Sequence, residues 1–146
     1  MMTYHLELRG EVSQGDVFES LPIVHVRQEF RRLAVITTAA MLITYDCEYD
    51  KPSTKLVSAA GVFPLVDVPA DRRGNVRKNK VFSTFYLAAT DRLEESFVDF
   101  RYAGLLEKAL VADEAQAGHR TTSLNDQAQL ALQEQLSAFF GYGRGR

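Results

Sequence analysis

The run MLITYDCEYDKP, residues 41–52, constrains the fold more than any other part of the chain. Its first half is apolar, its second half carries three acidic residues, and a proline ends it. Side chains of a β-strand alternate between two faces, so this run predicts one apolar face and one face that becomes acidic. The first face holds Met41, Ile43, Tyr45, Cys47 and Tyr49, and the second holds Leu42, Thr44, Asp46, Glu48 and Asp50. We predict a central strand that carries polar side chains to the rim of a sheet.

Other stretches rich in β-branched and aromatic residues predict further short strands around this one. They are expected at 4–8, from 17 until Pro22 interrupts the run, and at 23–30, 33–38, 56–68, 81–88 and 96–102. The long run 56–68 contains a break at Gly61, and residues 69–79 are predicted to form a polar connection.

The C-terminal third predicts helix, with one or two turns at 105–111 and a longer helix at 123–141. Ser123 is expected to be the N-cap, with Asp126 three residues later as in a capping box. The longer helix is amphipathic, because its apolar residues recur at helical spacing. They are Ala128, Leu132, Leu136 and Phe140.

These elements together predict an α+β, mostly β protein, in which a small curled antiparallel sheet or barrel precedes a C-terminal amphipathic helix. The length of 146 residues predicts a single domain, 1–146. Within it we expect a β core at 3–102, a short helix and loop at 103–122 and the final helix at 123–141.

Charge and cysteine content restrict the function classes. The net charge of −2 gives no overall attraction to nucleic acid, so such binding would need a local basic patch. The single cysteine excludes an internal disulfide framework and fits a reducing cytoplasm. No apolar run approaches the ~18–20 residues that cross a bilayer, and the polar N-terminus does not read as a signal peptide. We predict a cytoplasmic protein without a membrane partner or cofactor.

The acidic rim offers one candidate site, because Asp46, Glu48 and Asp50 are hard oxygen ligands that could hold a divalent cation. Same-face neighbours on a strand lie roughly 6.5–7 Å apart, so two of the three could bind one ion. The alternative is a solvated strand end beside Lys51. Cys47 is predicted to be a buried structural residue, since its acidic neighbours disfavour a reactive thiolate.

A basic segment offers a second candidate site. Its cations are Arg72, Arg73, Arg77, Lys78 and Lys80, and Phe82, Phe85 and Tyr86 follow them. Cations that contact phosphates, combined with aromatic rings that stack on bases, are typical of single-stranded RNA binding. The alternative is a solvated hairpin tip.

Several pieces of the chain resemble the MazF/PemK-like, CcdB-related ribonuclease toxins. The pieces are the opening strand at 14–18, the central strand at 41–44, the Pro64-Leu65 pair, the strand at 96–100 and the leucine-rich helix within 120–140. The resemblance implies a small SH3-like barrel with a C-terminal helix, a homodimer and an antitoxin partner. However, Ala39-Ala40 stands where the family has a catalytic Arg-Pro pair, and Val66 stands where it has a catalytic threonine. The resemblance therefore implies the barrel more than the RNA cleavage.

The sequence predicts two alternative functions, and a third is also considered. The first is single-stranded RNA binding with endoribonuclease activity, in which His25, Arg27, Asp46 and Arg101 supply the base, acid and cations around the 2′-hydroxyl and phosphate. The second is a non-catalytic protein-interaction module that uses exposed sheet edges. The third is a metal-dependent hydrolase that uses the acidic rim.

Overall fold

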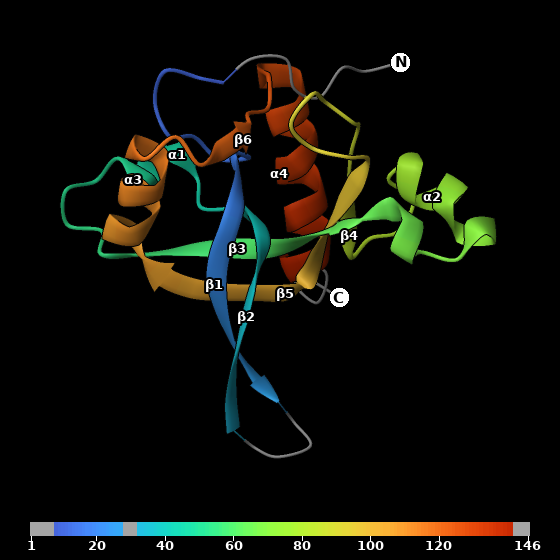
Figure 1. Ribbon diagram of the computed structural model, residues 1–146, viewed down its shortest axis with the longest axis horizontal. Coiled ribbons are helices and arrows are strands. Elements are labelled where there is room, and N and C mark those ends of the chain that lie inside the picture. Colours follow the sequence, from blue (N-terminus) through green and yellow to red (C-terminus); the bar gives the residue numbers. More distant parts are fainter. Residues whose placement is uncertain (1–7, 28–31, 142–146) are drawn as a thin grey trace.

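The fold is a six-stranded antiparallel sheet with helices on its faces and ends, as the computed structural model in Figure 1 shows. The structure describes residues 8–27 and 32–141, and for residues 25–27 and 32 it describes only the backbone. The strands are β1 (Val17–Arg27), β2 (Arg32–Leu42), β3 (Leu56–Pro64), β4 (Thr84–Leu87), β5 (Ser96–Glu107) and β6 (Arg120–Thr122). The helices are α1 (Asp46–Tyr49), α2 (Arg73–Arg77), α3 (Lys108–Gln116) and α4 (Asp126–Gly141), and two 3-10 turns, η1 (Leu65–Asp67) and η2 (Ala70–Arg72), precede α2.

The order of the strands is β4-β5-β3-β2-β1-β6, and each neighbouring pair is antiparallel. The predicted α+β class, antiparallel sheet and C-terminal helix are confirmed. No pairing joins β4 to β6 within the described residues, so the sheet is not closed into the barrel that we also expected. Residues 4–8, predicted as a strand, lie mostly outside the described part of the chain.

The sheet is buried on both faces because consecutive residues of β2 and β3 point in opposite directions. Met41, Ala60 and Val62 join a cluster under α4, into which Leu132 and Leu136 pack. The opposite cluster lies against α3, and its buried members are Phe18, Leu21, Ile23, Ala40, Leu42, Tyr49, Val57, Ala59, Leu106 and Val111. The apolar stripe predicted for the last helix is therefore a core face up to Leu136, whereas Phe140 is exposed.

Beyond the body of the molecule, β1 and β2 continue as a two-stranded ribbon (Figure 1). β2 pairs with β3 only over Ala40–Leu42. β3 continues along β5, and the register of that pairing shifts where Ala60 faces Ala103 and Gly61 faces Asp99. The ribbon begins where β2 separates from β3.

The acidic half of the central run is not a strand, which corrects the sequence prediction. β2 ends at Leu42, and Asp46–Tyr49 form α1. The Thr44 hydroxyl accepts the Ser58 N–H at 2.7 Å, and the Asp46 carboxylate accepts the Gln14 N–H at 2.6 Å. These contacts with distant segments turn the chain away from the sheet. Tyr49 is buried, whereas Cys47 is exposed, so the predicted burial of Cys47 is also wrong.

Several predicted boundaries shift for reasons visible in the contacts. β5 continues to Glu107 because residues 103–107 pair with β3, so α3 starts later than expected. α4 starts at Asp126, and the Asn125 side chain accepts the Ala128 N–H at 2.8 Å, which makes Asn125 the cap rather than Ser123. The Ser123 hydroxyl instead accepts the Arg9 N–H. The run predicted as a strand at 81–88 is a strand only at Thr84–Leu87.

Candidate functional site

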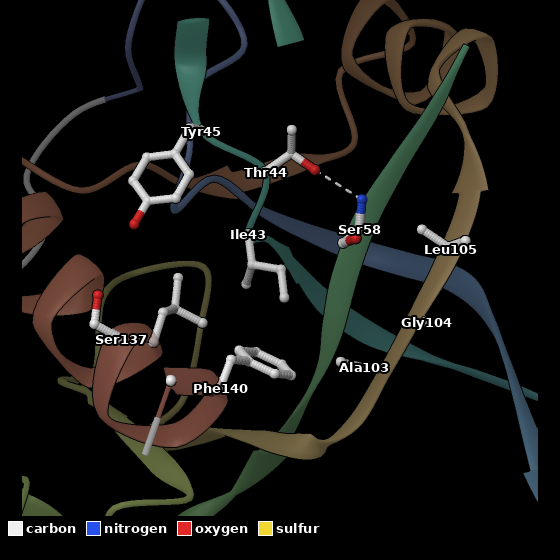
Figure 2. Close-up of a pocket in the computed structure, with 11 residues that line it drawn as sticks. Ile43, Thr44, Tyr45, Ser58, Ala103, Gly104, Leu105, Ser137 and Phe140 are labelled. Carbon is white, nitrogen blue, oxygen red and sulfur yellow. Dashed lines mark hydrogen bonds between the residues drawn. The ribbon is translucent and has the colours of Figure 1, made fainter. Parts of the chain in front are cut away.

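A groove of about 520 Å³ lies between the β2–α1 connection, the adjacent strands β3 and β5, and the C-terminal end of α4 (Figure 2). This volume falls within the roughly 300–1,000 Å³ of typical ligand sites. Its lining residues are Ile43, Thr44, Tyr45, Ser58, Ala103, Gly104, Leu105, Leu136, Ser137, Phe140 and Gly141. The β2–α1 turn, the pairing of β3 with β5 and the packing of α4 bring these residues around one space.

The polar groups of the groove are uncharged. Thr44 and Ser58 lie on one side, where the Thr44 hydroxyl accepts the Ser58 N–H, and Ser137 lies opposite them on α4 (Figure 2). None of the described lining residues is acidic, basic or histidine. The described lining therefore offers hydroxyl groups of Thr44, Tyr45, Ser58 and Ser137 beside apolar surface, without a charged partner for a ligand.

Large apolar side chains are exposed at this groove. Leu105 and Phe140 are each 57% exposed, and Tyr45 is 44% exposed. Exposed apolar groups that gather around a concave site mark a binding surface, whereas scattered ones carry no such meaning. These three come from β5, from α4 and from the β2–α1 connection, so the cluster is a product of the tertiary structure.

The floor of the groove adjoins an edge of β5 that has no paired strand in the described chain, although the backbone of β1 packs on this stretch at Gly104. Residues 103–107 of β5 pair with β3 on one side. β4 pairs with β5 only at residues 96–99, so in the described part of the chain no strand pairs with 103–107 on the other side. An extended chain can add to such an edge through main-chain hydrogen bonds.

The structure places the predicted catalytic residues on three different elements, with His25 and Arg27 on β1, Asp46 on α1 and Arg101 on β5. Arg101 donates to Asp99 at 2.8 and 3.0 Å, and Asp46 accepts from Gln14 at the start of α1. His25 pairs with Ala34 on the ribbon. The side chains of His25 and Arg27 lie outside the described residues.

Of the three acidic residues Asp46, Glu48 and Asp50, the side chains of the first two are engaged in separate hydrogen bonds. Asp46 also accepts from Gln129 Nε2 at 3.3 Å, while Glu48 accepts from Thr54 at 2.7 Å and from Lys51 at 3.0 Å. These bonds lower the pKa of Glu48, with Thr54 as the larger cause. Across the residues that the structure describes, no group of three acidic, cysteine or histidine side chains could hold a metal ion.

The basic segment is mostly helical rather than an open loop, and its cationic side chains differ in their contacts. Arg73 donates to the carbonyl oxygens of Val68 and Val66 at 2.8 and 3.0 Å. Arg77 donates to both oxygens of Glu95 at 2.8 and 3.1 Å. These two arginines therefore hold the segment itself in place. The remaining cations, Arg72, Lys78 and Lys80, are exposed.

The strongest electrostatic perturbation lies beside this segment. The Arg77 guanidinium, together with the Tyr86 hydroxyl, lowers the pKa of Glu95 to about 2. Burial, followed by the hydrogen bond to Glu95, raises the pKa of Tyr86 to about 12. Because this cluster is a satisfied ion pair with a neutral phenol donor, it stabilises the attachment of α2 to β4 and offers no free acid or base at neutral pH.

The groove could not be predicted from the sequence. Ile43, Thr44 and Tyr45 were expected in a strand, Leu136 and Phe140 were expected in the apolar stripe of a helix, and no role was predicted for Ser58 or Ser137. Small and apolar residues carry no chemical signature of a site, and these are spread from residue 43 to residue 141. The exposure of Leu105 and Phe140 would have been a signal, but it depends on the tertiary fold.

Comparison with protein-family models, with curated proteins and with solved structures found no match for this chain. The resemblance to MazF/PemK-like toxins therefore stays a prediction from the sequence. None of the helices in the described part of the chain combines the length and the hydropathy needed to cross a membrane.

Proposed function

We propose that this protein is a non-catalytic protein-interaction module, whose groove receives an uncharged apolar side chain from an extended segment of a partner protein. The observation that carries the proposal is the uncharged groove of about 520 Å³ beside the open edge of β5. The open edge favours a polypeptide over a small molecule, because it presents main-chain donors and acceptors in a row.

The recognition combines two contributions. Main-chain hydrogen bonds to residues 103–107 of β5 would supply affinity without regard to sequence. Side chains of an added strand alternate in direction, so one of them would point toward Ala103 and Leu105 and enter the groove. An aromatic or aliphatic anchor would bury apolar surface against Phe140. A charged anchor would lose its hydration without gaining a partner, so the groove selects against it.

A peptide-binding assay tests this proposal. A short capped peptide of threonine and valine with a central phenylalanine is compared, by fluorescence polarisation, with the same peptide carrying a central aspartate. We expect the phenylalanine peptide to bind at least about tenfold more tightly, equivalent to about 1.4 kcal/mol. Equal binding of the two peptides, or no binding of either, would overturn the proposal.

A matched pair of variants locates the binding. Ser137→Trp fills the groove from an exposed position of α4, and Gln127→Trp places the same ring on an exposed position of that helix away from the groove. We expect Ser137→Trp to weaken binding of the phenylalanine peptide about tenfold or more, while Gln127→Trp leaves it unchanged. Both variants must show the thermal unfolding midpoint of the parent protein.

Single-stranded RNA binding is the second candidate, and the exposed cations Arg72, Lys78 and Lys80 support it. Contacts with phosphates are salt-dependent, so a gel-shift assay with a mixed-sequence RNA at low salt is the appropriate measurement. If this candidate holds, the triple change to glutamine abolishes the shift, whereas Ser137→Trp does not affect it. No shift by the parent protein at low salt removes the candidate.

A further inference from the structure

The outer edge of β2 is a second surface that the proposed function does not use. Beyond the body of the molecule, β2 has β1 on one side, while its other side is open from Leu33 to Thr37 (Figure 1). Thr38 is still close to β3, since its hydroxyl lies 3.5 Å from the Val62 carbonyl oxygen. Within the described chain, residues 33–37 have no strand partner on that side.

Residues 33–37 of this edge, which follow Arg32, carry none of the features that normally prevent strands from pairing between molecules. Soluble proteins protect edge strands with charged side chains, prolines or bulges. The outer edge of β1 has such protection in Glu19 and Pro22, and β1 also has an irregular register between Phe18 and Leu21. Residues 33–37 read LAVIT, with no charge and no proline. Leu33 is 68% exposed and Val35 is 61% exposed.

We infer that the β2 edge at residues 33–37 pairs antiparallel with the same edge of a second copy of this chain. A two-fold axis places residue i of one copy opposite residue j of the other, and j opposite i, so the edge must be complementary to itself. With Val35 at the axis, Val35 faces its own counterpart and Leu33 faces Thr37. No pair brings like charges together, and the β-branched and apolar pairs stabilise the sheet.

The geometry and the composition favour a second copy as the occupant. The ribbon extends past β5 in Figure 1, which leaves room for a further strand beside its outer edge. The resulting four-stranded sheet, β1-β2-β2-β1, would bury the exposed faces of Leu33 and Val35 in both copies. Five residues from each copy make an interface below the roughly 800 Å² per partner of a standard interface. We therefore expect a reversible dimer that dissociates on dilution.

Sedimentation velocity over a concentration series tests this inference, with charge variants at the axis. Val35→Lys places two lysines opposite each other, and Val35 is exposed, so the monomer should fold normally. We expect the parent protein to change from monomer to dimer as concentration rises, and Val35→Lys to weaken dimerisation at least tenfold. Val66→Lys is the matched control, because Val66 is 67% exposed and lies outside the ribbon, and it should dimerise like the parent.

A charge-swap experiment separates this pairing from other modes of association. Val35→Glu alone should be monomeric, like Val35→Lys, but an equimolar mixture should form the heterodimer, because lysine then faces glutamate across the axis. A parent protein that stays monomeric at all concentrations would overturn the inference. So would a Val35→Lys variant that dimerises like the parent, or a mixture that stays monomeric although each variant is folded.

Discussion

At the scale of single residues, Asp46 is an acceptor that links segments distant in the sequence. It accepts from Gln14 at 2.6 Å and from Gln129 at 3.3 Å, and so joins the N-terminal loop, α1 and α4. The residues just before it, Ile43–Tyr45, form one wall of the groove. The residue type alone predicted a reactive or metal-binding carboxylate, because the sequence does not indicate that its partners are backbone and amide groups from distant segments.

Glu95 gives a pH-dependent prediction at this scale. Its pKa is lowered from 4.5 to about 2, so the folded protein binds fewer protons than the unfolded chain between these values. The stabilisation is complete above about pH 4.5 and is lost as pH falls toward about 2. We expect Glu95→Gln to lower the unfolding midpoint at pH 7 and to approach the parent protein below pH 3, as measured by thermal unfolding.

The neighbouring exposed Glu94 is the control for this measurement. Surface substitutions away from a specific contact usually change stability by less than about 0.5 kcal/mol, so Glu94→Gln should unfold like the parent protein at every pH. A deficit of Glu95→Gln that stayed constant from pH 7 to pH 3 would show that the carboxylate charge is not the cause.

At the scale of elements, the sequence predicts what depends on local periodicity. The core stripe of α4 has a 3.6-residue period, and β3 and β5 are rich in β-branched and aromatic residues, so these elements were expected close to where they begin. β1 and β2 were each expected in two pieces, but β1 continues through Pro22 and β2 through Ala39 and Ala40, because the two strands pair along their length. The helix α1 was missed, because its short alternating pattern fits a strand and only contacts with Gln14 and Ser58 decide against it. The extension of β5 to Glu107 was missed because it depends on pairing with β3.

The contact between β1 and β5 gives a prediction at this scale. A Cβ atom on Gly104 would lie 2.4 Å from the Val24 carbonyl oxygen and 2.9 Å from Ile23 Cγ2, so the two strands approach closely at this glycine. A backbone oxygen cannot move away without displacing β1. We expect Gly104→Ala to cost about 1–3 kcal/mol in the free energy of unfolding, measured with urea.

Gly74 in α2 is the matched control, because a Cβ atom there would have no other atom within 4 Å. Alanine also favours helix, so Gly74→Ala should be neutral or stabilising by up to about 1 kcal/mol. If Gly104→Ala proved as stable as Gly74→Ala, the close packing of β1 on β5 would be contradicted.

At the scale of the whole molecule, the groove is a product of topology. Its walls come from the β2–α1 connection, β3, β5 and α4, and no local pattern links these segments before the chain is folded. The basic segment is the opposite case, because its residues are close together in the sequence. Its charges were visible in the sequence, but the use of Arg73 and Arg77 within the fold was not. The overall class could therefore be predicted, whereas the site could not.

The central claim is that the groove binds an uncharged apolar group, and an NMR titration tests it most directly. The ¹⁵N-labelled protein is titrated with N-acetyl-phenylalaninamide and, separately, with the N-acetyl amide of aspartic acid. We predict that the first compound shifts the amide signals of Ser58, Ala103, Leu105 and Ser137, and that the second does not. Shifts centred on α2 or the ribbon, equal shifts with both compounds, or no shifts with either would contradict it.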